Sequence, residues 1–170
     1  MKLNIQRFVI NLSTAGIYLA YCVETTAGSR PTTGYTQLVG VKSTPSLNPA
    51  PETLETTTLE ETEWKTYIDG LKDMGGALEF TFNLTEDLIE QWDVLMEAYG
   101  TGKNQDLATW FAICIPQLKI DGVSQAYFFT GNPSQMGLPE TSVNSVLETT
   151  NYITPTGAPV RDAIPTLASI

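Results

Sequence analysis

The sequence contains no histidine, which removes the commonest general base and the commonest protein ligand of metal ions. Every Ser-His or Cys-His dyad is therefore excluded. Basic residues are also scarce, with 9 Lys and Arg against 19 Asp and Glu, so the formal net charge at pH 7 is −10. The basic residues are scattered singly, whereas binding nucleic acid through its phosphates requires clusters of them. This composition argues against histidine-dependent catalysis and against a nucleic-acid-binding protein.

Cysteine is nearly absent as well. Cys22 and Cys114 both lie inside apolar runs, and two cysteines are too few for a disulfide scaffold, so we expect free, buried thiols. The apolar run over residues 8–23 is interrupted by three polar residues, and no signal-cleavage site follows it. We therefore expect a soluble protein without a membrane partner, made in the cytoplasm.

The residues that are present indicate one folded domain over residues 1–170. Apolar residues make up 42% of the 170 residues and charged residues 16%, as in globular proteins. The 24 threonines favour strands over helix interiors. Apolar runs bounded by Gly, Pro, Asn and Asp predict strands at Ile17–Thr25, Tyr35–Val41, Leu54–Leu59, Leu78–Leu84, Ala108–Ile115, Val123–Thr130 and Val146–Ile153. The predicted fold class is mainly β with one helix.

Two of these strands carry clear patterns. In Leu78–Leu84 apolar residues alternate with polar ones, which predicts one face on the core and one in water. Glu79, Thr81 and Asn83 belong to the wet face. Ala108–Ile115 is apolar on both faces, which predicts a central strand.

One helix is predicted between a Thr85 cap and a stop at Gly100. Acidic residues occupy its first turn, where the helix dipole favours anions. Its apolar stripe consists of Leu88, Ile89, Trp92, Leu95, Met96 and Tyr99. We interpret this stripe as the face that packs on the sheet.

The remaining segments are loops and termini. Ser43–Pro51 is a long, proline-rich loop of the kind that serves contacts. Residues 1–16 form a predicted N-terminal arm, and residues 155–170, with three prolines, a predicted extended C-terminal tail. The apolar residues of this tail need a groove on the same subunit or on a neighbour. They are Val160, Ile164, Leu167 and Ile170.

The sequence contains no complete motif for phosphate binding, acid–base catalysis or calcium binding. Gly100–Lys103 lacks the Ser or Thr that follows the lysine of a phosphate loop, and it follows a helix and not a strand. Asp69 and Asp73 have nothing that would separate them into an acid and a base. The Glu60–Glu63 cluster lacks the spacing of a calcium loop and predicts a solvated acidic face. We predict no enzymatic activity, no cofactor and no metal.

The acidic residues are concentrated in one part of the chain. Residues Glu52–Glu97 hold 13 of the 19 acidic residues and 2 lysines, so the rest of the chain is almost neutral. Such a segment provides solubility, or it forms a surface that repels a polyanion. Composition leaves both interpretations open.

Four segments in order resemble the major tail tube protein of long-tailed bacteriophages. They are Gly-Val-Lys-Ser-Thr-Pro-Ser-Leu (40–47), Pro-Glu-Thr-Leu-Glu-Thr-Thr-Thr-Leu (51–59), Thr-Tyr-Ile-Asp-Gly-Leu-Lys-Asp (66–73) and Leu-Glu-Phe-Thr-Phe-Asn (78–83). Similar tubes occur in phage-tail-like bacteriocins and type VI secretion systems. The resemblance implies a tail-tube fold, a β-sandwich or barrel of about seven to eight strands with a flanking helix.

The resemblance also implies a function. Subunits of this family form hexameric rings that stack into a hollow virion tail, which is assembled in the host bacterial cytoplasm and through which the genome leaves. Expected partners are copies of the chain itself and the tape measure, distal tail and terminator proteins. DNA passes through the lumen without specific binding, because an acidic wall repels phosphates. Glu79, Thr81 and Asn83 are the candidate lumen-lining residues.

The segment Lys42–Glu63 is the candidate contact loop within and between rings. Its named members are Lys42, Pro45, Pro49, Pro51, Glu52, Glu55, Glu60, Glu61 and Glu63. An alternative function is a threonine-rich β-sandwich adhesin or carbohydrate-binding module, in which Trp64, Tyr67 and Trp110 would stack on sugar rings.

Overall fold

A computed structural model describes residues 12–48, 51–72, 74–143 and 145–168. Within these residues the elements are β1 (Tyr18–Val23), β2 (Thr33–Leu38), β3 (Val41–Ser43), β4 (Pro51–Glu55), β5 (Tyr67–Lys72), β6 (Leu78–Asn83), α1 (Glu86–Lys103), β7 (Thr109–Ile120), β8 (Val123–Pro133), β9 (Glu148–Pro155), β10 (Val160–Ala163) and β11 (Thr166–Leu167).

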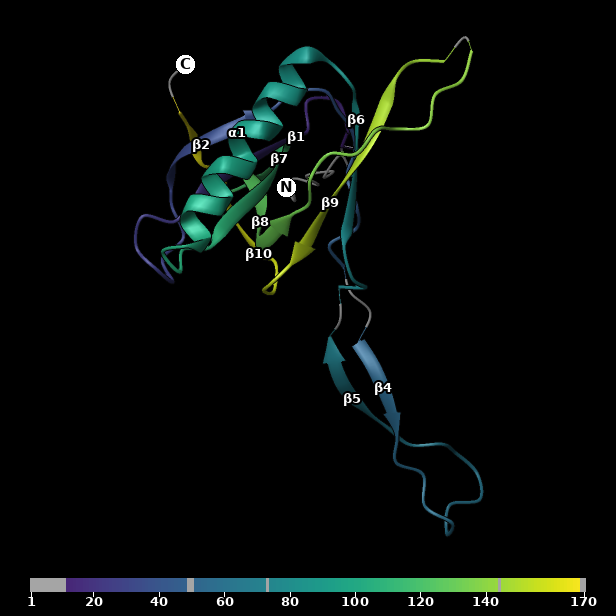
Figure 1. Cartoon of the computed structure of the whole chain (residues 1–170). Coiled ribbons are helices and arrows are strands. Elements are labelled where there is room, and N and C mark those ends of the chain that lie inside the picture. Colours follow the sequence, from purple (N-terminus) through teal and green to yellow (C-terminus); the bar gives the residue numbers. More distant parts are fainter. Residues whose placement is uncertain (1–11, 49–50, 73, 144, 169–170) are drawn as a thin grey trace, which may run out of the picture.

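The larger sheet has the strand order β11-β2-β1-β7-β8-β9-β6-β3, with β10 paired to β8, and it curls into a half-barrel with α1 at its side (Figure 1). The prediction of a mainly β fold with one flanking helix is confirmed. β7 lies between β1 and β8, as the apolar pattern of Ala108–Ile115 predicts. β4 and β5 form a separate two-stranded sheet.

Each face of the curled sheet has its own core. The stripe of α1 packs on one face, where Trp92 meets Phe82 edge to face with ring centroids 5.8 Å apart. The indole N–H of Trp92 donates to the Ser134 carbonyl at 3.0 Å, which satisfies its polar atom. On the other face, Tyr35 and Phe128 pack among small side chains. Cys114 lies in this second core and Cys22 packs against it; both are free thiols, as predicted, although Cys22 is only half-buried.

Helix α1 begins as predicted but ends later. The Thr85 hydroxyl accepts from the Leu88 backbone N–H at 3.2 Å, whereas the helix continues past Gly100 to Lys103. Gly102 is buried where the last turn of the helix approaches β1, and a Cβ there would lie 2.6 Å from Cγ1 of Val23. Glycine at 102 therefore serves close packing and not helix termination. Ile89, expected on the buried stripe, is 42% exposed.

Replacing Gly102 with alanine is expected to lower the free energy of unfolding by about 1–3 kcal/mol, because the added methyl overpacks the helix against Val23. Gly100→Ala is the matched control, since a Cβ at that position meets nothing within 4 Å. We expect it to gain about 0.5–1 kcal/mol from the lower entropy of the unfolded chain. Urea denaturation of both variants measures the difference, and equal effects would contradict the packing role of Gly102.

The β7–β8 hairpin is longer than predicted. β7 continues beyond Ile115 to Ile120, with an irregular register that accommodates Pro116. Asp121 and Gly122 have φ values of 51° and 82°, the backbone of a two-residue hairpin turn. The predicted strand ends at Ile115 because the proline that follows is unusual inside a central strand.

The C-terminal tail occupies a groove on the same subunit. β10 pairs with β8 and β11 pairs with β2, and both Ile164, between the two strands, and Leu167, in β11, pack against the second core. Arg30 lies 4.1 Å above the Phe128 ring and forms an ion pair with Asp162. Val160 remains 48% exposed, and Ile170 and residues 1–11 of the N-terminal arm lie outside the described residues.

Candidate functional site

A hairpin arm, residues 51–72, projects away from the curled sheet (Figure 1). It consists of β4, β5 and their connection, and β4 is not the predicted strand Leu54–Leu59 but Pro51–Glu55. Leu54 lies opposite Ile68 and Glu55 opposite Tyr67. All residues of the arm are exposed except Thr57 and Gly70, which are half-buried.

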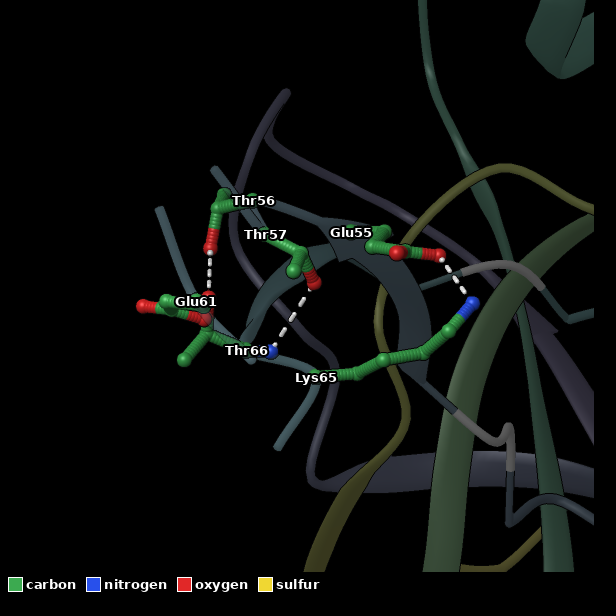
Figure 2. A network of polar contacts seen from close by, with 6 residues as sticks. All are labelled: Glu55, Thr56, Thr57, Glu61, Lys65 and Thr66. Atoms are coloured by element: carbon green, nitrogen blue, oxygen red, sulfur yellow. Dashed lines mark hydrogen bonds and ion pairs between the residues drawn. The ribbon is translucent and has the colours of Figure 1, made fainter. Parts of the chain in front are cut away.

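Polar contacts order the end of the arm (Figure 2). The Thr66 carbonyl accepts from the Thr56 backbone N–H at 2.8 Å, and the Thr66 N–H donates to the Thr57 hydroxyl at 3.1 Å. The Thr66 hydroxyl donates to Glu61 at 3.4 Å, and Lys65 Nζ lies 3.1 Å from a Glu55 oxygen. Both side chains of this ion pair are largely exposed, so the pair contributes little stability. The connection is thus held in shape by backbone and threonine contacts.

The arm carries apolar side chains in water. The most exposed are Leu59 at 105%, Leu71 at 85% and Trp64 at 82%; Leu54, Tyr67 and Ile68 are about half exposed. A two-stranded hairpin is marginally stable in water by itself, and grouped exposed apolar residues mark interaction surfaces. These two features together make the arm a candidate contact element.

A second candidate surface is the water-facing side of β3, β6 and β9, which we call the polar face. Glu79, Thr81 and Asn83 of β6 lie here, and Thr81 is half-buried while the other two are exposed. The register places them opposite residues of β9 on the same face: Tyr152, Thr150 and Glu148 respectively. Lys42 of β3 forms an ion pair with Glu148.

Residues of the loop between β8 and β9 and of β9 line a hollow on the polar face. The hollow measures about 510 Å³, and Leu138, Pro139, Glu140, Glu148 and Tyr152 contribute to its lining. Leu138 is 94% exposed. Within the part of the chain that is described, no group of three or more His, Cys, Asp or Glu side chains is arranged to hold a metal ion.

The residues of the predicted contact loop lie in three places. Lys42 is on β3. Pro45 lies between β3 and β4 and is half-buried, and Pro49 lies outside the described residues. Pro51, Glu52 and Glu55 are on β4, whereas Glu60, Glu61 and Glu63 are in the connection at the end of the arm. Thus the segment is not one loop: it joins the polar face to the arm.

Sequence reasoning missed the β9 half of the polar face. Glu148, Thr150 and Tyr152 alternate with inward residues, but two of those inward residues, Thr149 and Asn151, are themselves polar and buried. The alternation of polarity is therefore hidden in β9. The pairing of β9 with β6 reveals this face, and that pairing is not visible in the sequence.

Of the three aromatics proposed for sugar stacking, Trp110 is half-buried, and its indole N–H donates to Glu24 at 2.8 Å. Trp64 and Tyr67 are exposed, but both belong to the arm.

No family model matches the sequence, and no curated protein matches it. A solved structure has a similar fold: a chain in the cryo-EM structure of the anti-feeding prophage (AFP) baseplate, 6-fold symmetrised. The TM-score is 0.55 at 10% sequence identity, and the match covers 92% of this chain and 99% of that chain. In the described residues, no helix has the length and apolarity needed to cross a membrane.

Proposed function

We propose that this chain is a structural subunit of a phage-like tail, which assembles into six-membered rings that stack as a hollow tube. The observation that carries the proposal is the projecting arm, whose exposed apolar side chains require a partner surface. The fold neighbour comes from a six-fold symmetrised baseplate, and the four sequence segments resemble tail tube proteins. Ring formation and stacking both follow from head-to-tail contacts between copies of one chain.

In such a ring we assign the polar face to the bore. Its side chains are mostly hydroxyl, amide and carboxylate groups, and its one lysine, Lys42, is neutralised by Glu148. A wall of this kind offers phosphates no cationic partner, so DNA or another anionic cargo slides past it. The remaining partners are the tape measure, distal tail and terminator proteins of the particle, and assembly takes place in the bacterial cytoplasm.

Shortening the arm tests the proposal. A chain in which two glycines replace residues 53–70 is expected to remain folded, because the arm contributes nothing to either core cluster. It should stay monomeric at concentrations at which the unaltered chain forms rings or rods. Negative-stain electron microscopy and sedimentation velocity measure assembly, and circular dichroism confirms the fold.

Two results would contradict the proposal: rods of normal length from the shortened chain, or an unaltered chain that stays monomeric at high concentration. A persistent monomer that binds glycans through Trp64 and Tyr67 would instead support the carbohydrate-binding alternative.

A further inference from the structure

The side of the sheet that carries α1 has an open hollow of about 390 Å³ over the middle of β7 and β8. Ile113, Ile115 and Tyr127 of these strands line it and are called its floor here, and Thr44, Pro45, Leu47 and Asn48 complete the lining. No acidic residue lines it. Arg161 of β10 lies opposite Tyr127 in the register, so its side chain projects from the same side of the sheet. Arg161 is exposed and makes no ion pair with any described residue.

Three other hollows suit an acidic partner less well, because acidic residues line them. Glu140 and Glu148 line the hollow on the polar face, and Glu97 lines a shallow one beside α1. A smaller hollow of about 240 Å³ is lined by both Lys103 and Asp106, so its lining carries one positive and one negative charge. A further hollow, lined by Lys72 and Met74, also has no acidic residue in its lining, but it lies at the base of the chain's own arm. Among the hollows away from the arm, only the one whose Tyr127 lies opposite Arg161 combines a lining free of acidic residues with a basic neighbour, which suits an acidic, apolar segment.

The end of the arm has this chemistry. Trp64 is 82% exposed and follows Glu63 directly, while Glu60 and Glu61 lie on the same connection. Tryptophan is among the commonest anchors of protein interfaces. The threonine contacts of Figure 2 hold the connection before any partner binds, which lowers the entropic cost of docking.

We propose that the arm end of one copy docks into this hollow of a second copy, with Trp64 on the floor of Ile113, Ile115 and Tyr127 and Glu63 beside Arg161. This inference rests on the proposed function. The arm points away from its own body (Figure 1), which favours a second copy as the partner of its end. Since donor and acceptor surfaces differ, each bound copy leaves one free arm and one free hollow, and association continues until a ring closes or a stack grows.

Charge exchange tests the contact. Glu63→Lys and Arg161→Glu are each expected to weaken self-association about 10-fold or more, because like charges then face each other. The double variant should restore association, and so should an equimolar mixture of the two single variants. Glu63→Lys combined with Lys103→Glu carries the same charge changes at an unrelated site and should show no rescue. Sedimentation velocity over a concentration series gives the association constants.

Removal of the anchor gives a second measurement. Trp64→Ala is expected to weaken self-association about 100-fold, whereas Trp64→Phe retains most of it. Unchanged association in Trp64→Ala, or loss in Arg161→Glu that Glu63→Lys does not rescue, would overturn the docking and assign the hollow to another occupant.

The docking and the proposed function fail separately. Rings or rods that form normally from Trp64→Ala overturn the docking and leave the tube function standing. If the exchanged charges restore association but electron micrographs show only open chains or dimers, the tube function is overturned and the docking stands. A monomeric unaltered chain overturns both.

Discussion

Replacing Glu24 with alanine is expected to lower the free energy of unfolding by about 3 kcal/mol or more, because three donors lose a buried charged acceptor. Glu24 is 4% exposed. One carboxylate oxygen accepts from the backbone N–H groups of Gly28 at 3.0 Å and Ala108 at 3.1 Å, and the other from the Trp110 indole at 2.8 Å. The side chain thus ties the loop after β1 to the start of β7. Urea denaturation measures the loss, and Glu140→Ala, at an exposed site, is the control.

The same carboxylate makes stability depend on pH. Burial raises the pKa of Glu24, but the hydrogen bonds from Trp110, Ala108 and Gly28 outweigh it, so the pKa lies below its usual 4.5. The unfolded chain therefore takes up this proton first as the pH falls. The stabilisation is fully present above about pH 4.5 and is lost as the pH falls through the folded-state pKa.

Glu24→Gln isolates this contribution, since glutamine keeps the shape and loses the titration. The difference in unfolding free energy between the unaltered chain and Glu24→Gln should be largest near neutral pH and should shrink in acid. A difference that grows in acid would mean that the carboxylate is destabilised by burial and not held by its three donors.

Patterns within one element were predictable from the sequence. Leu78–Leu84 alternates cleanly, and β6 has the predicted buried and exposed faces. Thr85 caps α1 because capping needs only residues three positions apart. In contrast, the predicted end at Gly100 was wrong, because the fit of Gly102 against Val23 is set by packing between elements distant in the sequence.

Pairing between strands that are distant in the sequence could not be predicted from it. β10 and β11 are short, and their register is fixed by the edges of β8 and β2 and not by a pattern of their own. β5 was missed because Asp69 and Gly70 interrupt the apolar alternation; Gly70 is required there, since a Cβ would lie 2.9 Å from the Glu52 carbonyl oxygen. Glu24, a single acid near the end of an apolar strand, gave no sign of burial because its partners at 108 and 110 are remote.

Stopping the chain after Thr156 is expected to cost about 4 kcal/mol and to uncover the second core. The truncation removes β10, β11, Ile164 and Leu167, so it loses two strand pairings and two partly buried apolar side chains. Ile164→Ser alone should cost about 2 kcal/mol. Val160→Ser, at a side chain that is 48% exposed, should cost less than about 0.5 kcal/mol.

The Cys114 thiol reports whether the tail covers this core in solution. Burial raises the pKa of Cys114 to about 11, and a hydrogen bond from Tyr18 offsets part of that effect, so the thiol is uncharged at neutral pH. In the unaltered chain it should react with a thiol reagent only when the protein opens. The truncated chain should label many times faster at neutral pH, while Val160→Ser should label at the unaltered rate. Equal labelling of the truncated and unaltered chains would contradict the packing of the tail on this face. Ile164 and Leu167 would then not cover the second core of their own chain in solution.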